Sequence, residues 1–246
     1  MRLQGKTAIV TGGASGFGAG IVRKFAAEGA KVLIADLNLD LAEEVAAEVG
    51  GFAAKADVAS NDSVAELAEI AASKLGGVDI LVNNAGITHL PKPMQDVTED
   101  EFDRVMAVNC KSVYLTTKHF VPAMIGRGSG AILNVASTAG LSPRPKLNWY
   151  NASKGWMVTA TKTMAVELAP NGVRVNALCP VAGETPLLKS FMGEDTPEMR
   201  AKFLSTIPIG RFSTPEDLGN AACYLCSDEA GMITGVAMEV DGGRCI

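Results

Sequence analysis

A tyrosine and a lysine four residues apart, Tyr150 and Lys154, are the side chains of this sequence best suited to move a proton. Residues at i and i+4 lie on one face of a helix, so both side chains can reach the same ligand. A tyrosine hydroxyl has a pKa near ~10 and is a poor base at neutral pH, but a neighbouring cation favours the phenolate and lowers that pKa. A downward shift of ~2–3 units corresponds to roughly 3–4 kcal/mol. The pair therefore predicts acid–base chemistry at Tyr150.

Ser137 ends an apolar run, Ala131–Ala136, and precedes Tyr150 by 13 residues. The run predicts a buried strand, so the hydroxyl should stand at the carboxyl edge of a sheet, where open α/β sheets bind ligands. From that place it can hydrogen-bond a substrate oxygen and stabilise the charge that develops there.

A glycine-rich turn lies between the β-branched run Thr7–Thr11 and a helical stretch, Gly18–Glu28. Glycines let the backbone turn tightly and approach a pyrophosphate, whose charge is favoured at a helix N-terminus. The placement between a strand and a helix makes this turn a candidate dinucleotide site. The residues expected at the cofactor are Gly12, Ser15, Gly16, Phe17 and Gly18.

Asp36 ends the second β-branched run and follows Gly18 by 18 residues. An acid at this place accepts hydrogen bonds from the adenosine ribose of a dinucleotide. Its carboxylate would repel a 2'-phosphate, so the sequence favours NAD over NADP. The alternative is that Asp36 only caps a helix or a turn.

These residues need a scaffold, and the chain supplies alternating strand and helix patterns. Apolar strands separated by helices predict a parallel sheet covered on both sides, which is an α/β doubly wound (Rossmann-type) fold. Strands are expected at Thr7–Thr11, Lys31–Ala35, Gly51–Lys55, Val78–Val82, Ala131–Val135, Val173–Ala177 and Val236–Val240, and helices at Gly18–Glu28, Leu39–Val49, Ser63–Leu75, Glu101–Ile125 and Tyr150–Leu168.

The absence of a linker or a composition break predicts one domain over residues 1–246. Residues 183–214 interrupt the alternation with three prolines and several apolar residues. Long insertions after a sheet strand are often lids or binding loops. We therefore expect this segment to lie at the substrate.

The spacing T-G-x-x-x-G-x-G of the glycine turn resembles the short-chain dehydrogenase/reductase family, and the resemblance extends over essentially the whole chain. Asn83–Gly86 reads NNAG, an element of this family, and Tyr150–Lys154 matches its Tyr-x-x-x-Lys motif. The resemblance implies an oxidoreductase that transfers a hydride between NAD(H) and the CH–OH group of a small alcohol or ketone. It implies a catalytic set of Asn109, Ser137, Tyr150 and Lys154, and further cofactor contacts at Asp57, Val58, Asn84, Ala85, Gly86, Pro180 and Thr185.

Within the resemblance, Asn109 anchors a water chain to Lys154, and Lys154 also donates to the nicotinamide ribose. NADP-preferring members often carry a basic residue where this chain has Ser15, which again favours NAD. The chain departs from the family after the sixth strand. Val181 stands where the family has glycine, and Gly183 stands at a position that is usually β-branched.

The substrate is predicted only in outline, as a secondary alcohol or ketone. A 3-oxoacyl thioester or a sugar is an alternative, because the closest resemblance is to the 3-oxoacyl-carrier-protein reductase and glucose dehydrogenase-like branches. A non-catalytic dinucleotide-sensing protein is a further alternative, although such proteins commonly lose the tyrosine or lysine. The pocket candidates are Thr138, Leu141, Asn148, Trp149, Glu184, Leu187, Leu188, Phe191 and Met192.

The composition of the chain excludes several classes of protein. Its 246 residues are 48% hydrophobic and 20% charged, with a net charge of −5, which argues against a nucleic-acid binder. No apolar run reaches the ~18 residues of a membrane span, so we expect a cytoplasmic protein. The five cysteines include a Cys223-x-x-Cys226 pair with no second pair at ligand spacing, so no metal is predicted. The family resemblance implies a homotetramer that pairs the two long helices.

Overall fold

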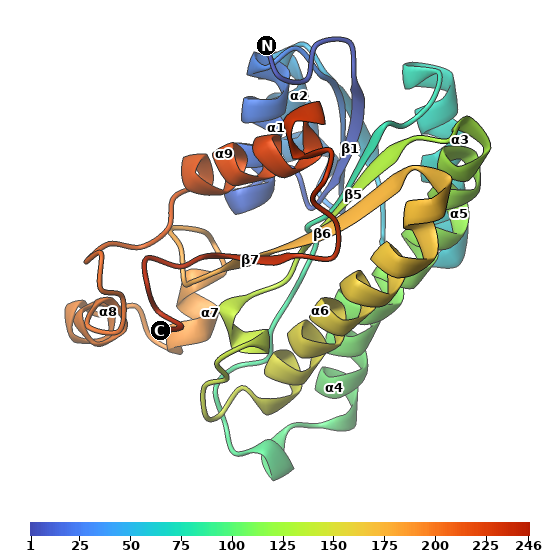
Figure 1. Ribbon diagram of the computed structural model, residues 1–246. Coiled ribbons are helices and arrows are strands. Elements are labelled where there is room, and N and C mark those ends of the chain that lie inside the picture. Colours follow the sequence, from blue (N-terminus) through green and yellow to red (C-terminus); the bar gives the residue numbers. More distant parts are fainter.

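The computed structural model describes all 246 residues. Seven parallel strands form one sheet, with the order β3-β2-β1-β4-β5-β6-β7. The doubly wound parallel fold predicted from the sequence is confirmed (Figure 1). The strands are β1 (Thr7–Thr11), β2 (Lys31–Asp36), β3 (Phe52–Lys55), β4 (Ile80–Asn83), β5 (Gly130–Val135), β6 (Val173–Pro180) and β7 (Ala237–Val240).

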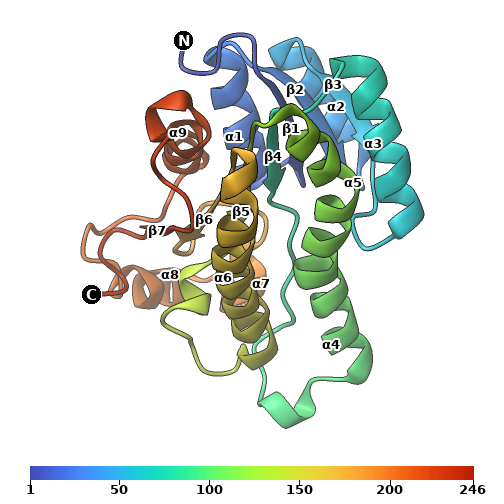
Figure 2. The same cartoon turned by 45° about the vertical axis from the view of Figure 1, so that its right-hand side comes forward.

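Nine α-helices surround the sheet and cover both of its faces (Figures 1 and 2). Two hydrophobic clusters hold the layers together. Helices α1, α2 and α9 contribute to one, and α3, α5 and α6 contribute to the other. The helices are α1 (Gly16–Ala27), α2 (Leu39–Val49), α3 (Asn61–Leu75), α4 (Glu99–Met106), α5 (Ser112–Arg127), α6 (Asn148–Leu168), α7 (Leu188–Met192), α8 (Pro197–Leu204) and α9 (Pro215–Cys226).

Strand β1 shows why the sheet is apolar on both faces. Ala8 and Val10 point into the first cluster, and Ile9 between them points into the second. All three are fully buried. Alternate side chains of a strand point to opposite faces, so a strand covered on both sides reads as one continuous apolar run.

The order of the strands reverses beside β1, which pairs with β2 on one side and with β4 on the other. In open α/β sheets, ligands bind outside the carboxyl ends of the strands at such a switch point. The glycine turn follows β1 and Asp36 ends β2, so the topology brings these two predicted cofactor elements together.

The predicted helix over Glu101–Ile125 is not continuous. Helix α4 ends at Met106, a π-helical turn spans Ala107–Lys111, and α5 follows from Ser112. The side chain of Asn109 in this turn bonds the backbone of Ile87, outside its own helix. Single π turns inside α-helices are frequently found at functional sites. Apolar periodicity alone does not reveal them.

Residues 183–214, between β6 and α9, contain the two short helices α7 and α8. They pack around a small cluster separate from the two sheet clusters. None of the helices combines the length and apolar character that crossing a membrane requires. No three histidine, cysteine, aspartate or glutamate side chains converge to form a metal site.

Candidate active site

The turn after β1 requires glycine for two different reasons. Gly12 and Gly16 have positive φ angles of 61° and 51°, which other residues rarely adopt. Gly18 has no room for a side chain, because a Cβ there would lie 2.1 Å from the carbonyl oxygen of Gly12. The backbone of the turn is thereby held close to the first turn of α1.

The N-terminus of α1 has free capacity for an anion. Ser15, its N-cap residue, makes no side-chain capping bond, and the first turn holds no acidic residue. By contrast, Asn38, Ser60 and Thr98 cap α2, α3 and α4. Backbone N–H groups at an uncapped helix N-terminus bind phosphate readily. This end of the cavity therefore fits the pyrophosphate of a dinucleotide.

Asp36 lies on the cavity wall and also fixes the turn. Its carboxylate accepts hydrogen bonds from the backbone N–H groups of Ala14 and Asn38, both at 3.1 Å. Asp36 therefore does cap the turn, which was the alternative role predicted from the sequence. This role does not use up the carboxylate, which has about four acceptor positions, so Asp36 can also receive ribose hydroxyls.

Asn84 holds the turn from the other side. Its amide donates to the carbonyl oxygens of Thr11 and Gly12, both at 2.9 Å, and the Thr11 hydroxyl accepts bonds from the backbone N–H groups of Asn84 and Ala85. The amide of Asn84 thus positions the cofactor loop.

A cavity of about 430 Å³ runs along the carboxyl edge of the sheet, and it brings nearly all of the predicted residues together. Its volume lies within the usual range for ligand sites. Of the predicted catalytic and cofactor-binding residues, only Asn109 is missing from its wall. The predicted residues that line it are Gly12, Ser15, Gly16, Phe17, Gly18, Asp36, Asp57, Val58, Asn84, Ala85, Gly86, Ser137, Tyr150, Lys154, Pro180 and Thr185.

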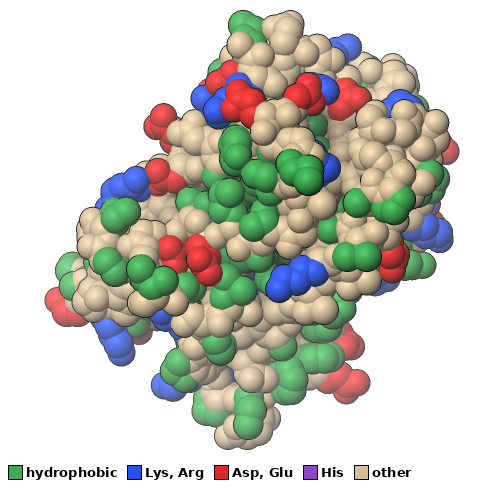
Figure 3. All heavy atoms as spheres, viewed as in Figure 1, with side chains coloured by type: hydrophobic (Ala, Val, Ile, Leu, Met, Phe, Trp, Pro, Cys, Tyr) green, Lys and Arg blue, Asp and Glu red, His purple; other side chains and the backbone are tan.

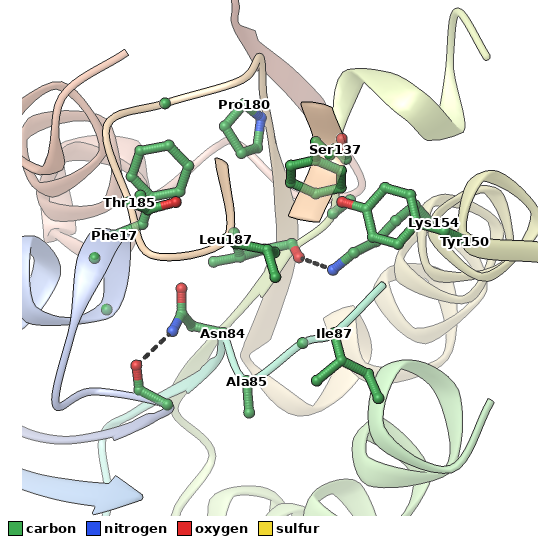
Figure 4. A pocket seen from close by; sticks show the side chains of 18 of the residues that line it. Phe17, Asn84, Ala85, Ile87, Ser137, Tyr150, Lys154, Pro180, Thr185 and Leu187 are labelled. Carbon is green, nitrogen blue, oxygen red and sulfur yellow. Dashed lines mark hydrogen bonds between the residues drawn. The ribbon is translucent and has the colours of Figure 1, made fainter. Parts of the chain in front are cut away.

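Tyr150, Ser137 and Lys154 gather on one side of the cavity, while Phe17 and Thr185 lie on the other (Figure 4). Tyr150 and Lys154 are both only 4% exposed. The Lys154 Nζ atom donates a 2.8 Å hydrogen bond to the carbonyl oxygen of Val135 and lies 6.0 Å from the centre of the Tyr150 ring. The i, i+4 spacing therefore does bring the two side chains to one ligand site.

Burial dominates the protonation of this group. It raises the pKa of Tyr150 to about 12, although a hydrogen bond with Ser137 and the charge of Arg144 act in the opposite direction. Burial also lowers the pKa of Lys154 to about 8. The expected lowering of the Tyr150 pKa is therefore wrong for the protein by itself, because desolvation outweighs the hydrogen bond with Ser137 and the charge of Arg144.

Asn109 is fully buried behind the cavity. Its amide donates to the carbonyl oxygen of Ile87 and to the Ser153 hydroxyl, both at 2.9 Å, and its oxygen accepts from the Ile87 N–H at 2.9 Å. A Cβ on Gly86 would lie 3.3 Å from Lys154 Nζ and 3.4 Å from Asn109 Oδ1. The glycine thus leaves these two polar groups room to approach the same wall.

The departure from the family after β6 has a steric cause. A Cβ on Gly183 would lie 2.2 Å from the Phe17 ring and 2.8 Å from the carbonyl oxygen of Ser213. The ring of Phe17 therefore occupies the space that a side chain at position 183 would need. Val181 is buried with the apolar residues of the 183–214 segment. Thr185 keeps its place beside Gly16, since a Cβ added at Gly16 would lie 3.1 Å from the Cβ atom of Thr185.

The substrate side was predicted less well. Thr138, Leu187 and Phe191 line the cavity as expected, and Phe191 lies 5.1 Å from Tyr150 between ring centres. The other six candidates do not reach it. Trp149 packs on Phe102 instead. Leu188 and Met192 fill the small cluster, Leu141 and Asn148 are exposed, and Glu184 lines a separate shallow pocket.

Among the cavity residues that were not identified from the sequence, Arg144 and Phe203 stand out, because one carries a charge and the other a large aromatic ring. Arg144 lies between two prolines in the loop that leads into α6, six residues before Tyr150. The short distance in sequence between this cation and Tyr150 could have identified Arg144 as a residue of the site. Phe203 belongs to α8, and nothing in its sequence context places it at the cavity.

Comparison with known proteins decides the family. A family model described as enoyl-(acyl carrier protein) reductase matches residues 12–244. The 4-formylbenzenesulfonate dehydrogenase of Comamonas testosteroni is 49% identical over the full length of both chains. The 3-oxoacyl-[acyl-carrier-protein] reductase of Thermotoga maritima is 39% identical, again over both full lengths. The chain belongs to the short-chain dehydrogenase/reductase family.

The fold agrees with this assignment. The crystal structure of a 3-ketoacyl-(acyl-carrier-protein) reductase from Brucella melitensis complexed with NADH superimposes with a TM-score of 0.95. It is 51% identical and covers 99% of this chain and 100% of its own. The prediction of an oxidoreductase of this family is confirmed by these relatives, and the NADH in the Brucella melitensis structure agrees with the predicted cofactor.

Proposed function

We propose that this enzyme transfers a hydride reversibly between NAD(H) and a secondary alcohol or ketone, with Tyr150 as the general acid and base. One observation carries the proposal. Tyr150, Lys154 and Ser137 meet at one end of a cavity whose other end is formed by the glycine turn and Asp36. A buried proton donor beside a dinucleotide site is the arrangement that carbonyl reduction requires.

The residues that would hold the cofactor follow from the cavity wall. The uncapped start of α1 would bind the pyrophosphate, and Asp36 would accept hydrogen bonds from the adenosine ribose and repel a 2'-phosphate. Asp57 and Val58 on the cavity wall would contact the adenine, and Pro180 and Thr185 would contact the nicotinamide part, as the family resemblance implies. When bound, NAD(H) donates or accepts the hydride. The Brucella melitensis relative, whose crystal structure is a complex with NADH, supports this assignment.

Tyr150 suits the acid role in ketone reduction. Because its pKa is raised to about 12, the phenol is protonated at neutral pH and has a proton to donate to the carbonyl oxygen. Ser137 can donate a second hydrogen bond to that oxygen. In alcohol oxidation, Tyr150 must first lose its proton, and a charged Lys154 favours that loss. Without ligands, the protein therefore holds Tyr150 in the protonated form that ketone reduction needs.

Asn109 acts through other residues. We assign it as a positioning residue, because its three hydrogen bonds fix Ile87 and Ser153, which flank Gly86 and Lys154. No atom of Asn109 reaches the cavity wall. Its place near Lys154 remains compatible with the water chain that the family resemblance implies.

The substitution Tyr150→Phe tests the proposal. Steady-state rates with NADH and a panel of ketones, and with NAD+ and the matching secondary alcohols, should fall about 10³-fold in kcat, since a positioned acid or base contributes ~10²–10⁴. Binding of NADH, measured by titration, should change little. Tyr114→Phe, on the exposed face of α5, is the matched control and should retain full activity. Undiminished turnover in Tyr150→Phe would refute the mechanism.

The panel also separates the alternatives. Turnover confined to 3-oxoacyl thioesters or to sugars would assign the enzyme to one of those branches. Binding of NADH without turnover of any compound would favour a dinucleotide sensor. The presence of both Tyr150 and Lys154 at the cavity supports an enzyme.

We infer a single domain over residues 1–246 whose 183–214 segment borders the substrate, because Phe191 and Phe203 of that segment line the cavity beside Tyr150. Limited proteolysis tests the inference. A cut confined to the segment should be slowed by substrate, whereas separation into two stable fragments would contradict a single domain.

We also infer a homotetramer. Helices α5 and α6 lie side by side (Figure 2) and expose Tyr114, Trp156 and Val166 by 57%, 41% and 77%. Hydrophobic side chains also gather between α9 and β7 (Figure 3). Two different apolar faces suit a tetramer with dihedral symmetry. Sedimentation of a monomer would contradict this inference, and cytoplasmic localisation stays a prediction.

A further inference from the structure

Arg144 lies on the cavity wall, and its guanidinium group has no ion-pair or hydrogen-bond partner in the protein. Arg23, Arg200 and Arg211 each form an ion pair with a carboxylate at the surface. The guanidinium of Arg144 makes no ion pair and donates no hydrogen bond, although the residue is partly buried and lines the cavity that contains Tyr150. Because Arg144 lines the cavity and no carboxylate pairs with it, its N–H groups are available to a ligand there.

The loop that carries Arg144 is well fixed. The Asn151 amide donates a 2.7 Å hydrogen bond to the Arg144 carbonyl oxygen, and the Lys92 N–H donates a 3.0 Å bond to the carbonyl oxygen of Lys146. The guanidinium carbon lies 4.4 Å from the centre of the Phe203 ring. The ring supports the flat face of the guanidinium and leaves its N–H edge for a ligand.

A second cation reinforces the positive charge. Burial lowers the pKa of Arg144 to about 10, and the nearby charge of Arg244 adds to this lowering, so Arg144 remains charged at neutral pH. The other groups that act on Arg144 are Cys245 and Tyr150, and none is a carboxylate. Asp241 is the acidic residue nearest to Arg244 in the sequence. Its carboxylate accepts hydrogen bonds from the backbone N–H groups of Gly243 and Cys245.

Arg244 also has hydrogen-bond donors that are not satisfied within the protein. Its Nη1 atom lies 3.5 Å from the Ser142 hydroxyl, and its buried Nε atom has no hydrogen-bond partner. The C-terminal segment that carries it ends close to α7 and α8 (Figure 1). Arg144 thus lies near a second cation, and no carboxylate is among the groups that act on it.

We propose that Arg144 binds an anionic oxygen-bearing group, a carboxylate or a sulfonate, on the substrate, at the end remote from the reacting carbon. The proposal rests on the proposed oxidoreductase function and adds a substrate class to it. Leu187, Phe191 and Phe203 supply apolar wall on the same side of the cavity. The substrate is accordingly an apolar body with the alcohol or ketone at Tyr150 and the anion at Arg144. The planar fork of arginine matches such oxyanions with two parallel hydrogen bonds.

Three ketones of similar shape test the proposal: 4-acetylbenzenesulfonate, 4-acetylbenzoate and the neutral 4-acetylbenzamide. With NADH, wild-type kcat/KM should be at least about tenfold higher for one or both anions than for the amide. The difference should lie mainly in KM, because an anchor remote from the reaction binds substrate and transition state equally. In Arg144→Gln the preference should collapse to within about twofold.

The ratio between anion and amide is the readout, because Arg144 also influences the pKa of Tyr150 and its loss affects every substrate. Arg104→Gln is the matched control. Arg104 is exposed on α4, has no partner and lies outside the cavity, so the ratio should stay at the wild-type value. The preferred anion distinguishes a sulfonate from a carboxylate substrate.

Two outcomes would overturn the proposal: a wild-type enzyme that uses the amide as well as both anions, or an Arg144→Gln variant that keeps the wild-type ratio. If none of the ketones turns over, the same comparison is made with their dissociation constants for the NAD+-loaded enzyme. Failure of both anions to bind at millimolar concentration would then contradict the Arg144 proposal. The Tyr150→Phe variant distinguishes failure of the proposed function from failure of the Arg144 proposal. It should stop turnover of all three ketones but keep the binding preference, whereas turnover that survives in this variant refutes the proposed function and leaves the Arg144 site standing.

Discussion

The two ends of the cavity are built in different ways. At the cofactor end the backbone of the turn is tightly fixed, since a Cβ on Gly18 would meet the carbonyl oxygen of Gly12 and the side-chain amide of Asn84 bonds both Thr11 and Gly12. At the substrate end, residues 183–214 pack around a cluster of five buried residues that is separate from the sheet. The first end cannot change without disturbing the sheet. The second can vary in size and charge while the chemistry stays in place.

Gly18→Ala should break the cofactor end with the largest effect on stability. The new Cβ would lie 2.1 Å from the Gly12 carbonyl oxygen, so we expect a loss of about 3 kcal/mol in unfolding free energy together with loss of NADH binding. The control is Gly126→Ala in α5, where nothing lies within 4 Å. That variant should gain about 0.5–1 kcal/mol, as alanine is the better helix former. Denaturant titration checks both, and equal midpoints for Gly18→Ala and wild type would contradict the expectation.

The substitution Lys154→Met tests how the buried charge of Lys154, between the cofactor end and the substrate end, affects stability. The pKa of Lys154 falls from 10.5 to about 8 on folding, so below pH 8 folding must bury a charge, and this cost fades as the pH rises toward 10.5. Without that charge, and after losing the bond to Val135, the variant should gain about 1–2 kcal/mol at pH 7.

The gain of Lys154→Met should shrink in denaturant titrations at higher pH, while kcat at pH 7 falls by about 10²-fold or more. Lys162→Met, exposed on the same helix, should change neither value. A Lys154→Met variant less stable than wild type at pH 7 would show that the ammonium stabilises the fold.

Gly183→Ala tests the contact between the two ends with a smaller effect. Its Cβ would meet the Phe17 ring at 2.2 Å, so overpacking should cost about 1–2 kcal/mol and weaken NADH binding. Adding Phe17→Leu should recover part of that loss, although the Ser213 carbonyl oxygen at 2.8 Å limits the rescue. A double-mutant cycle measures the coupling. Purely additive effects would show that Phe17 does not require glycine at position 183.

The sequence predicts the cofactor end well because its chemistry is local. A turn with positive φ needs glycine, a strand-to-helix turn exposes backbone N–H groups, and the acid that ends β2 faces them. Leu39–Val49 was predicted with its observed bounds. These features depend on neighbours in the chain or on the alternation of apolar residues, and both can be read from one sequence.

The substrate end depends on tertiary contacts that no local pattern encodes. The π-helical turn at Asn109 follows from bonds to Ile87, 22 residues away. The raised pKa of Tyr150 follows from burial that only the folded chain provides. Arg144 stood beside Tyr150 in the sequence, but its lack of a partner becomes visible only once every nearby carboxylate has been placed.

Binding of NADH and NADPH to the wild-type enzyme, measured by titration without any substrate, tests most directly that this cavity is an NAD(H) site with its adenosine end at Asp36. We expect NADH to bind at least about tenfold more tightly than NADPH. Asp36→Asn, which keeps an acceptor but removes the charge, should narrow the difference. Equal or tighter binding of NADPH by the wild-type enzyme would contradict the cofactor assignment.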